Sequence, residues 1–428
     1  MSRIDRREFL KLMSAAAAAG TVPWLSSCSN EAAAAALPKD FYTIPKRGNV
    51  RILHCTDFHG QLNPVFFREP NVNLGMGDAF GRPPHMVGKQ FLKEMGLKEN
   101  TPEAHAYTYL NFNKSAKQFG RMGGMAHMKT LADSLREQMG GRENTLMLDG
   151  GDLWQGSGTS LWTRGVDMVE ASNILGIDVM VGHWEFTYKE NEVLSNVALF
   201  KGDFIGQNVR VKEDSLMDDG YAKLVETYDG RGLYDEDTGH AFQPYVIREV
   251  GGARICVVGQ AFPRTANANP QEFFPDWSFG LREDDMIELV EAIREDEKPD
   301  AIVLLSHNGM DVDVKMAERV PGLNAVFGGH THDGVPKPLK VKNVEGHECL
   351  VTNAGSNGKF LGVMDFDIDG GKIKSMNYEM LPIFSEALPA DKELQAYIDQ
   401  MRNTKYDKNI VESRVKKMHY NKSRLGTS

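Results

Sequence analysis

Short apolar segments alternate with helical patterns along most of the chain, and this alternation restricts the possible fold more than any other feature. Strand-like runs rich in apolar residues occupy positions 50–55, 144–148, 177–181, 301–305 and 323–327. Apolar residues at helical spacing lie between them, as at Met125, Met128, Leu131 and Leu135. Hairpins are expected around residues 251–252 and 369–370. Strands that alternate with helices, with some hairpins, predict an α/β fold with mixed sheets.

Each of these strand-like runs is followed by polar residues that can bind a metal ion. These residues are Asp57, His59, Asp152, His183, His307, His330 and His332. They include five of the twelve histidines, although a single strand-end histidine is more often structural than a ligand. Because ligands bind beyond the carboxyl ends of strands in open α/β sheets, these side chains are expected to converge. Two carboxylates and five imidazoles exceed one tetrahedral site, and they suit two divalent ions that share a bridging carboxylate.

This set of ligands also predicts the metal and the reaction class. Nitrogen and oxygen ligands without thiolates favour manganese, zinc or iron over calcium or copper(I). Two such ions can lower the pKa of a bound water and stabilise the oxygens of a tetrahedral oxyanion. The expected reaction is therefore hydrolysis at phosphorus or at hexavalent sulfur.

The composition argues against two other classes of protein. The chain has 428 residues and a net charge of −10, whereas a nucleic-acid binder normally carries a basic surface. The sequence contains no run of about 18 consecutive apolar residues, so no transmembrane helix is expected. We therefore expect neither a nucleic-acid partner nor a membrane-spanning segment.

Residues 1–37 are expected to form an export signal. An arginine pair at positions 6–7 precedes a Phe-Leu-Lys sequence and a weakly apolar run, as in bacterial twin-arginine signals. A basic amphipathic helix is the alternative. Cys28 ends a Leu-Ser-Ser-Cys sequence that resembles a lipoprotein cleavage site, and cleavage near Ala36 competes with it. The protein is therefore expected in the periplasm, with or without a lipid anchor on Cys28.

The order of the strand-end motifs resembles that of a known enzyme family. The set D-x-H, G-D, G-N-H-[DE], H and G-H-x-H is typical of the calcineurin-like dinuclear metallophosphoesterases, and the surrounding sequence is similar to their 5′-nucleotidase branch. The resemblance covers residues 49 to about 365. It implies a four-layer α/β/β/α sandwich with two mixed sheets. It also implies two metal sites joined by a bridging residue: Asp57, His59 and His332 at one, His183, His307 and His330 at the other, and Asp152 between them.

The sequence departs from this pattern at GHWEF, residues 182–186. The family has Asn then His after the glycine, whereas this chain has His183 and Trp184. An imidazole can replace the amide as a ligand. In the family, the histidine that follows this asparagine helps to protonate the leaving group. The indole of Trp184 cannot do so because it only donates a hydrogen bond. Either the enzyme is impaired or its leaving group needs no acid.

One subfamily accounts for this departure. The stretches GHWEFTY, FGRMGGMAH, GGHTHD and TNAGSNGKFLG resemble the SoxB thiosulfohydrolases of bacterial sulfur oxidation. That resemblance implies hydrolysis of a thiosulfonated cysteine on the SoxYZ carrier protein, with release of sulfate and, most simply, with two manganese ions. A persulfide leaving group is a stronger acid than an alcohol, so no acid catalyst is required. We interpret Trp184 as part of a channel for the sulfane chain, with a packing role as the alternative.

Other residues are candidates for substrate binding or for support of the ligands. Arg121 lies between glycines before a helix, where a guanidinium suits an oxyanion, although a structural salt bridge is equally expected. Glu185 is expected to orient a ligand histidine. Asn357 lies in a glycine-rich loop that could come near the site. The predicted catalytic residues are therefore Arg121, His183 and Trp184, and the predicted substrate-binding residues are Arg121, Trp184 and Asn357.

The expected domain organisation has three parts. Residues 1–37 form the signal, residues 38–385 form the catalytic domain with an irregular insertion at 60–115, and residues 386–428 form a linker helix and tail. The C-terminal domain of the family is expected to be missing. Two alternative functions remain open: a periplasmic 5′-nucleotidase or related phosphoesterase, and a metal-binding component that docks the carrier without catalysis.

Overall fold

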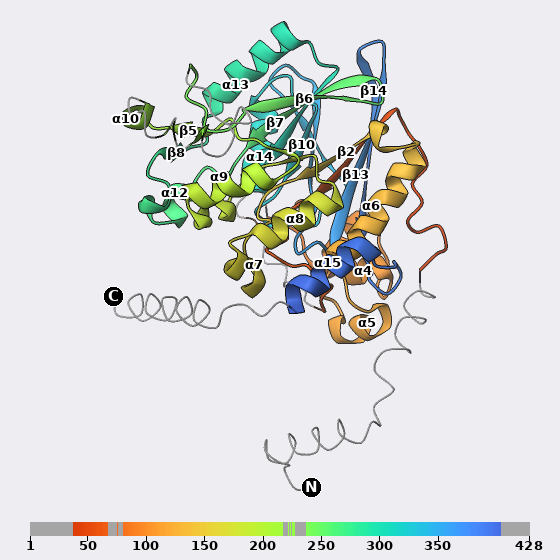
Figure 1. The fold of residues 1–428 in the computed structure, drawn as a ribbon. Helices are drawn as coiled ribbons and strands as arrows, with labels where there is room; N and C mark the ends of the chain where they lie inside the picture. Colours follow the sequence, from red (N-terminus) through yellow and green to blue (C-terminus); the bar gives the residue numbers. More distant parts are fainter. Residues whose placement is uncertain are drawn as a thin grey trace.

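The computed structural model describes residues 37–66, 75, 80–216, 221, 223, 225–226 and 237–403 (Figure 1). Apart from residue 37, the expected export signal with Cys28 lies outside the described residues, and so does the tail after residue 403. Within the described ranges, no helix has both the length and the apolar character needed to cross a membrane.

Two six-stranded mixed sheets form the centre of the molecule. The first has the order β14-β13-β1-β2-β3-β4. Strands β1 to β4 run parallel to one another, and β13 runs antiparallel to both of its neighbours, β1 and β14. Its strands are β1 (Val50–Cys55), β2 (Thr145–Asp149), β3 (Val179–Met180), β4 (Asp203–Phe204), β13 (Phe360–Asp369) and β14 (Lys372–Pro382).

The second sheet has the order β11-β12-β10-β9-β7-β6, with β12, β10, β9 and β7 parallel and an antiparallel strand at each edge. Its strands are β6 (Tyr245–Val250), β7 (Ala253–Gln260), β9 (Ala301–Ser306), β10 (Ala325–Gly328), β11 (Leu339–Lys342) and β12 (Glu348–Asn353). A separate antiparallel pair consists of β5 (Val209–Val211) and β8 (Trp277–Phe279).

The two sheets pack face to face because successive strand residues point to opposite sides. In β1, Ile52 belongs to the core between the sheets and Leu53 to the core under the outer helices. In β9, Val303 faces the first sheet and Leu304 faces the helices on the other side. The central strands β1, β2, β9 and β10 are buried on both faces, which explains why they read as continuous apolar runs.

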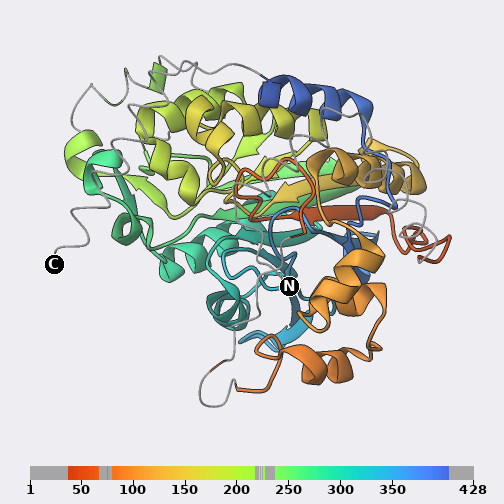
Figure 2. The ribbon, with the colours of Figure 1, turned by 90° about the horizontal axis from the view of Figure 1, so that it is seen from below.

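Helices cover both outer faces and complete four layers. The first sheet is covered by α6 (Met125–Met139), α8 (Val166–Leu175), α9 (Glu190–Leu199) and α15 (Lys392–Asn403). The second is covered by α13 (Glu283–Ala292), which continues into η5 (Ile293–Glu297), and by α14 (Met310–Arg319). Figure 2 shows the yellow-green helices and the blue α15 together on one side of the sheets. The predicted α/β/β/α sandwich with two mixed sheets is confirmed.

The insertion at 60–115 is more regular than the sequence indicated. The expected irregular insertion at 60–115 includes α3 (Gly88–Met95), α4 (Pro102–Tyr107) and the start of α5 (Phe112–Phe119). These helices pack against Phe360, Met380 and Phe384 of the first sheet and the segment after it. The expected linker helix is α15, and its buried residues join the core beside α6 and α8.

The remaining elements are short and connect the layers. They are η2 (Arg142–Asn144), α7 (Gly158–Thr163), η3 (Trp184–Tyr188), α10 (Glu213–Leu216), α12 (Thr265–Ala268) and η4 (Gln271–Phe273). The first sheet carries GHWEF at the end of β3, where Trp184 begins η3.

Candidate metal centre

The seven predicted ligands come together at the carboxyl ends of parallel strands from both sheets. They fall into two groups in which the potential ligand atoms all lie within 4.8 Å of one another. We call Asp152, His183, His307 and His330 the buried group, and Asp57, His59 and His332 the open group. The resemblance implies His183, His307 and His330 at one metal and Asp57, His59 and His332 at the other, and the structure places each of these trios in one group, with Asp152 in the buried group.

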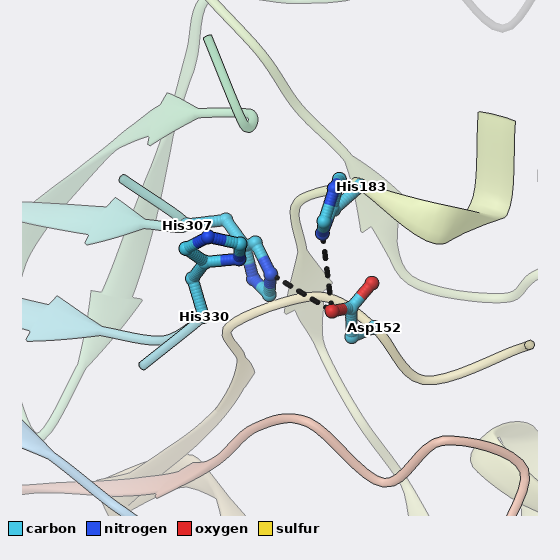
Figure 3. A group of neighbouring side chains, drawn as sticks. All are labelled: Asp152, His183, His307 and His330. Atoms are coloured by element: carbon cyan, nitrogen blue, oxygen red, sulfur yellow. Dashed lines mark hydrogen bonds and ion pairs between the residues drawn. The ribbon is translucent and has the colours of Figure 1, made fainter. Parts of the chain in front are cut away.

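The buried group is organised around one carboxylate oxygen (Figure 3). Asp152 Oδ2 lies 3.1 Å from His183 Nδ1 and 3.1 Å from His307 Nε2. The ring of His330 is near, with its centroid 5.1 Å from that of His183. Nδ1 is bonded to Cγ, as the side-chain oxygen of asparagine is, so His183 can offer a donor atom at the same covalent distance from the backbone. This explains how an imidazole can occupy the asparagine position of the family pattern.

The open group is more accessible to solvent. His59 Nε2 lies 2.9 Å from His332 Nε2, which lies 3.3 Å from Asp57 Oδ1. The side chains of His59 and His332 are 21% and 26% exposed, whereas that of Asp57 is buried. His59 Nε2 is also 3.8 Å from Asp152 Oδ2. The groups are therefore adjacent and suit one dinuclear site.

The backbone at the site adopts an uncommon conformation. Five of the seven residues have positive φ: Asp57 at 54°, His59 at 52°, Asp152 at 56°, His330 at 73° and His332 at 56°. Non-glycine residues rarely occupy this left-handed region, and such positions cost on the order of 1–3 kcal/mol each. Hydrogen bonds between the loops hold them there, including His59 N to Asp152 O at 2.7 Å. Strain concentrated on the candidate ligands supports a functional site.

The charges of the site fit divalent cations. Burial is the largest single influence and would raise the pKa of Asp57 and Asp152. The neighbouring histidines together outweigh it, His307 most of all, with His332 at Asp57 and His183 at Asp152, so both pKa values are lowered and the two carboxyl groups are ionised. Burial would lower the pKa of His307, but Asp152 and Asp57 raise it to about 10. The metal-free protein thus balances its buried carboxylates with an imidazolium proton, which a divalent ion can replace.

One histidine has a second hydrogen bond that fixes its tautomer. His307 Nδ1 donates to the carbonyl of Gly150, so Nε2, which faces Asp152 and the site, is the nitrogen that can give up its proton and bind an ion. Metal-binding histidines usually make such an outer hydrogen bond. The donor set is nitrogen and oxygen only, which suits manganese, zinc or iron.

Glu185 supports the site through backbone amides and not through an imidazole ring. Its buried carboxylate accepts hydrogen bonds from the amides of His183 at 2.8 Å, Asp152 at 3.3 Å, Leu153 at 2.7 Å and Trp154 at 3.0 Å. The expected contact with a ligand histidine therefore exists, but it is made to the backbone of His183. Glu185 joins the loop after β3 to the loop that carries Asp152.

The three other predicted site residues have different surroundings. Trp184 donates its amide to Asp152 Oδ1 at 2.8 Å, and its ring lies 4.6 Å from that of His183. The backbone N–H of Asn357 donates to the backbone carbonyl of Asp57 at 2.7 Å, so its loop does reach the site. Arg121 pairs with Glu386, with Nε 3.1 Å from Oε1. Within the described ranges, no hydrogen bond or ion pair joins its side chain to the seven ligands.

Sequence reasoning missed Phe262. Its ring centroid lies 4.2 Å from that of His183 and 4.2 Å from that of His330. The residue follows β7, which is another parallel strand that ends at the same edge of the second sheet. The sequence QAFP after the apolar run of β7 is the signal that could have indicated it.

Comparisons with known proteins agree with this fold and site. No protein-family model matches the chain. The chain is 26% identical over 286 residues to Protein UshA of Yersinia enterocolitica, a match that covers 61% of this chain and 48% of UshA. It is 25% identical over 300 residues to the 5′-nucleotidase of Rattus norvegicus, covering 66% and 47% of the two chains. The chain thus spans about half the length of the curated relatives it matches.

The same likeness extends to solved structures. The sulfate thiohydrolase SoxB of Thermus thermophilus, in complex with glycerol, superposes with a TM-score of 0.72 and 33% identity, covering 84% of this chain and 61% of that chain. The fold is that of the calcineurin-like phosphoesterases of the 5′-nucleotidase family. With the two ligand groups, these likenesses support a metal-dependent hydrolase of the phosphoesterase type.

Proposed function

We propose that this chain is a thiosulfohydrolase that releases sulfate from a thiosulfonated cysteine of a SoxYZ-type sulfur carrier protein. The observation that carries the proposal is the pair His183–Trp184, in which a ligand histidine stands where the family has asparagine and an indole stands where it has an acid. The similarity to the SoxB structure supports the same substrate class.

Two divalent ions, which we propose to be Mn²⁺, would be held by the buried and open groups and would supply a hydroxide nucleophile and positive charge for the oxyanion. Arg121 would need to leave Glu386 before it could contact a substrate, so its proposed role depends on a rearrangement of that ion pair. Asn357 and Trp184 lie beside Asp57 and Asp152 respectively, where they can border a bound sulfonate.

The chemistry of the leaving group explains why Trp184 is compatible with catalysis. The oxygen of water forms a bond to the sulfonate sulfur, and the bond between that sulfur and the sulfane sulfur breaks. The electron pair stays on the sulfane sulfur as a persulfide on the carrier, while the protons of water leave with sulfate or to solvent. A phosphate ester would instead expel an alkoxide, which needs a proton that an indole cannot supply.

The proposed location is the periplasm. The twin-arginine pattern at positions 6–7 supports export, and a lipid on Cys28 would anchor the protein to a membrane. Mass spectrometry of the mature protein from a bacterial host distinguishes the two forms, because a lipidated Cys28 would be the first residue and would carry the added acyl mass.

A 5′-nucleotidase is the second candidate, because the sequence relatives include the rat 5′-nucleotidase. Trp184 argues against it for the reason given above. A carrier-docking protein without catalysis would not need all seven ligands to converge, and they do converge.

Sulfate release from a thiosulfonated cysteine carrier, measured beside phosphate release from a nucleotide with the manganese-loaded protein, separates these functions. We expect sulfate and no phosphate. Phosphate alone would establish the nucleotidase, and neither product with two ions bound would favour the docking protein. Trp184→His is expected to reduce sulfate release, and unchanged release would remove Trp184 from the proposal.

A further inference from the structure

Phe262 lies on the faces of two candidate ligands and is fixed from both sides. Its ring is tilted 47° to that of His183 and 33° to that of His330, with both centroids 4.2 Å away. Its amide donates to the carbonyl of Gly182 at 3.2 Å, and its carbonyl accepts from the Thr265 hydroxyl at 2.8 Å. These two bonds hold the backbone of Phe262 in the position from which its ring contacts both histidines.

The histidines of the buried group differ in how their rings are held. His307 has the Gly150 carbonyl as a hydrogen-bond acceptor for its outer nitrogen. His183 Nε2 is buried and has no hydrogen-bond partner among the described residues. Within the same ranges the ring of His330 has no hydrogen bond either. The two histidines without such a bond are the two that contact Phe262.

We propose that Phe262 is a positioning residue for the metal centre: together with Trp184 it fixes the ring orientations of His183 and His330 in place of the missing outer hydrogen bonds. The inference rests on the dinuclear centre of the proposed function, but it requires no particular substrate. Phe262 touches the ligands and not the reacting atoms, so it acts through the two histidines.

The physical basis is the weak torsional preference of an imidazole. The bond that turns a histidine ring has a broad, roughly two-fold preference, so a half-turn is accessible when nothing opposes it. For His183 this half-turn would exchange Nδ1 for a carbon and remove the donor atom beside Asp152. The ring centroids of Trp184 and Phe262 lie 4.6 Å and 4.2 Å from that of His183, and both rings resist that rotation. Ring contacts of this kind are energetically favourable in addition to the area they bury.

Manganese titration of Phe262→Leu tests the proposal without substrate. Isothermal titration calorimetry of the full chain is expected to show one of the two ions bound roughly 10- to 100-fold more weakly, which is the loss typical when an orienting partner of a ligand is removed. Electron paramagnetic resonance is expected to change from the signal of two coupled Mn²⁺ ions to that of an isolated ion at substoichiometric loading. Phe262→Tyr, which keeps the ring, should restore both.

A matched control is available elsewhere in the chain. Phe112 also lies on a histidine, with its ring centroid 5.8 Å from that of His105, outside the candidate centre. Phe112→Leu should leave manganese affinity and the resonance signal unchanged. A general effect of losing a phenylalanine would change both variants, and that result would overturn the proposal.

Wild-type affinity for both ions in Phe262→Leu, with the coupled signal intact, would also overturn the proposal. Equal losses in the leucine and tyrosine variants would do the same, because the ring would then not be the cause. Failure of the proposed function gives a different pattern, in which the wild-type protein binds two ions but releases no sulfate, Phe262→Leu still binds one ion more weakly, and Phe262→Tyr still restores it.

Discussion

The buried and open groups contain similar ligands but differ in what surrounds them. In the buried group, His307 is fixed by Gly150, His183 lies between two aromatic rings, and Glu185 ties the loops together. In the open group, His59 and His332 are partly exposed and contact each other directly. The departure from the family pattern falls in the buried group, whereas the open group keeps the usual residues.

This difference suggests a division of roles. A rigid, dry surrounding fixes ligand geometry and strengthens electrostatic interactions, because the local dielectric constant is low. An exposed group lets water and substrate approach at the cost of looser metal binding. We therefore expect the buried group to determine where the centre forms and the open group to exchange its ion more readily.

Loss of Asp152 should abolish the distinction between the groups. In Asp152→Asn the charge shared by His183, His307 and His59 is gone, so neither ion keeps its central anionic ligand. Metal content after gel filtration is expected to fall from two ions to fewer than one, and activity by more than the roughly 100-fold seen when orienting residues are lost.

Asp149→Asn is the control for that variant. Burial raises the pKa of Asp149 well above its ordinary value, and its carboxyl contacts the Gly151 amide and the Cys55 thiol, so an amide there removes no candidate ligand. A control that lost metal as Asp152→Asn does would attribute the effect to loop disruption. Two bound ions in Asp152→Asn would show that this residue does not bridge.

Removing one histidine from each group should destabilise the metal-free protein to very different extents. His307→Ala leaves the buried carboxylates of Asp57 and Asp152 without the imidazolium between them, which is expected to cost about 3–5 kcal/mol of the free energy of unfolding. His59→Ala removes a partly exposed ring and should cost less than about 1 kcal/mol. Urea unfolding after chelation measures both. Equal losses would contradict the difference in burial between the groups.

Glu185→Gln should weaken the buried group while leaving the open group in place. The amide nitrogen of glutamine would face a pair of backbone N–H groups in place of one carboxylate oxygen, and each unsatisfied donor costs about 1–3 kcal/mol. Manganese affinity of one ion is expected to fall roughly 10- to 100-fold. A titration in which both ions weaken equally would mean that Glu185 supports the whole centre.

The sequence predicts that the seven candidate ligands converge because each follows closely after a strand end. Buried strands can be recognised in the sequence as apolar runs. Residues such as Asp57 and His307 come directly after these runs, so the local sequence is sufficient to predict where they lie. The short helices α3, α4 and α5 were not predicted, since segments of six to eight residues carry little periodicity and depend on packing against Phe360 and Phe384.

Contacts between distant segments account for the rest. The partner of Arg121 is 265 residues away, and Phe262 reaches His183 only because the two sheets meet at their ends. No spacing rule connects such positions. Glu185 shows an intermediate case, in which its importance was predicted but its contact with four backbone amides depended on the fold.

The smallest expected effect tests whether metal binding by the buried group depends on helix α9. Glu190, at the start of α9, accepts hydrogen bonds from the amides of Asp276 and Trp277, and burial raises its pKa to about 8. The folded protein therefore holds a proton that the unfolded chain releases above about pH 4.5, so this group lowers stability as pH rises from there to about 8.

Glu190→Gln should raise the melting temperature at pH 8 by roughly 2–4 °C for each kcal/mol recovered, and should not change it at pH 4. Glu192→Gln on the same helix removes a partly exposed carboxylate that pairs with Arg164, and it is the control for loss of a glutamate from α9. Manganese binding should be unaffected by either change, and a loss of one ion in Glu190→Gln would show that the rigidity of the buried group extends as far as α9.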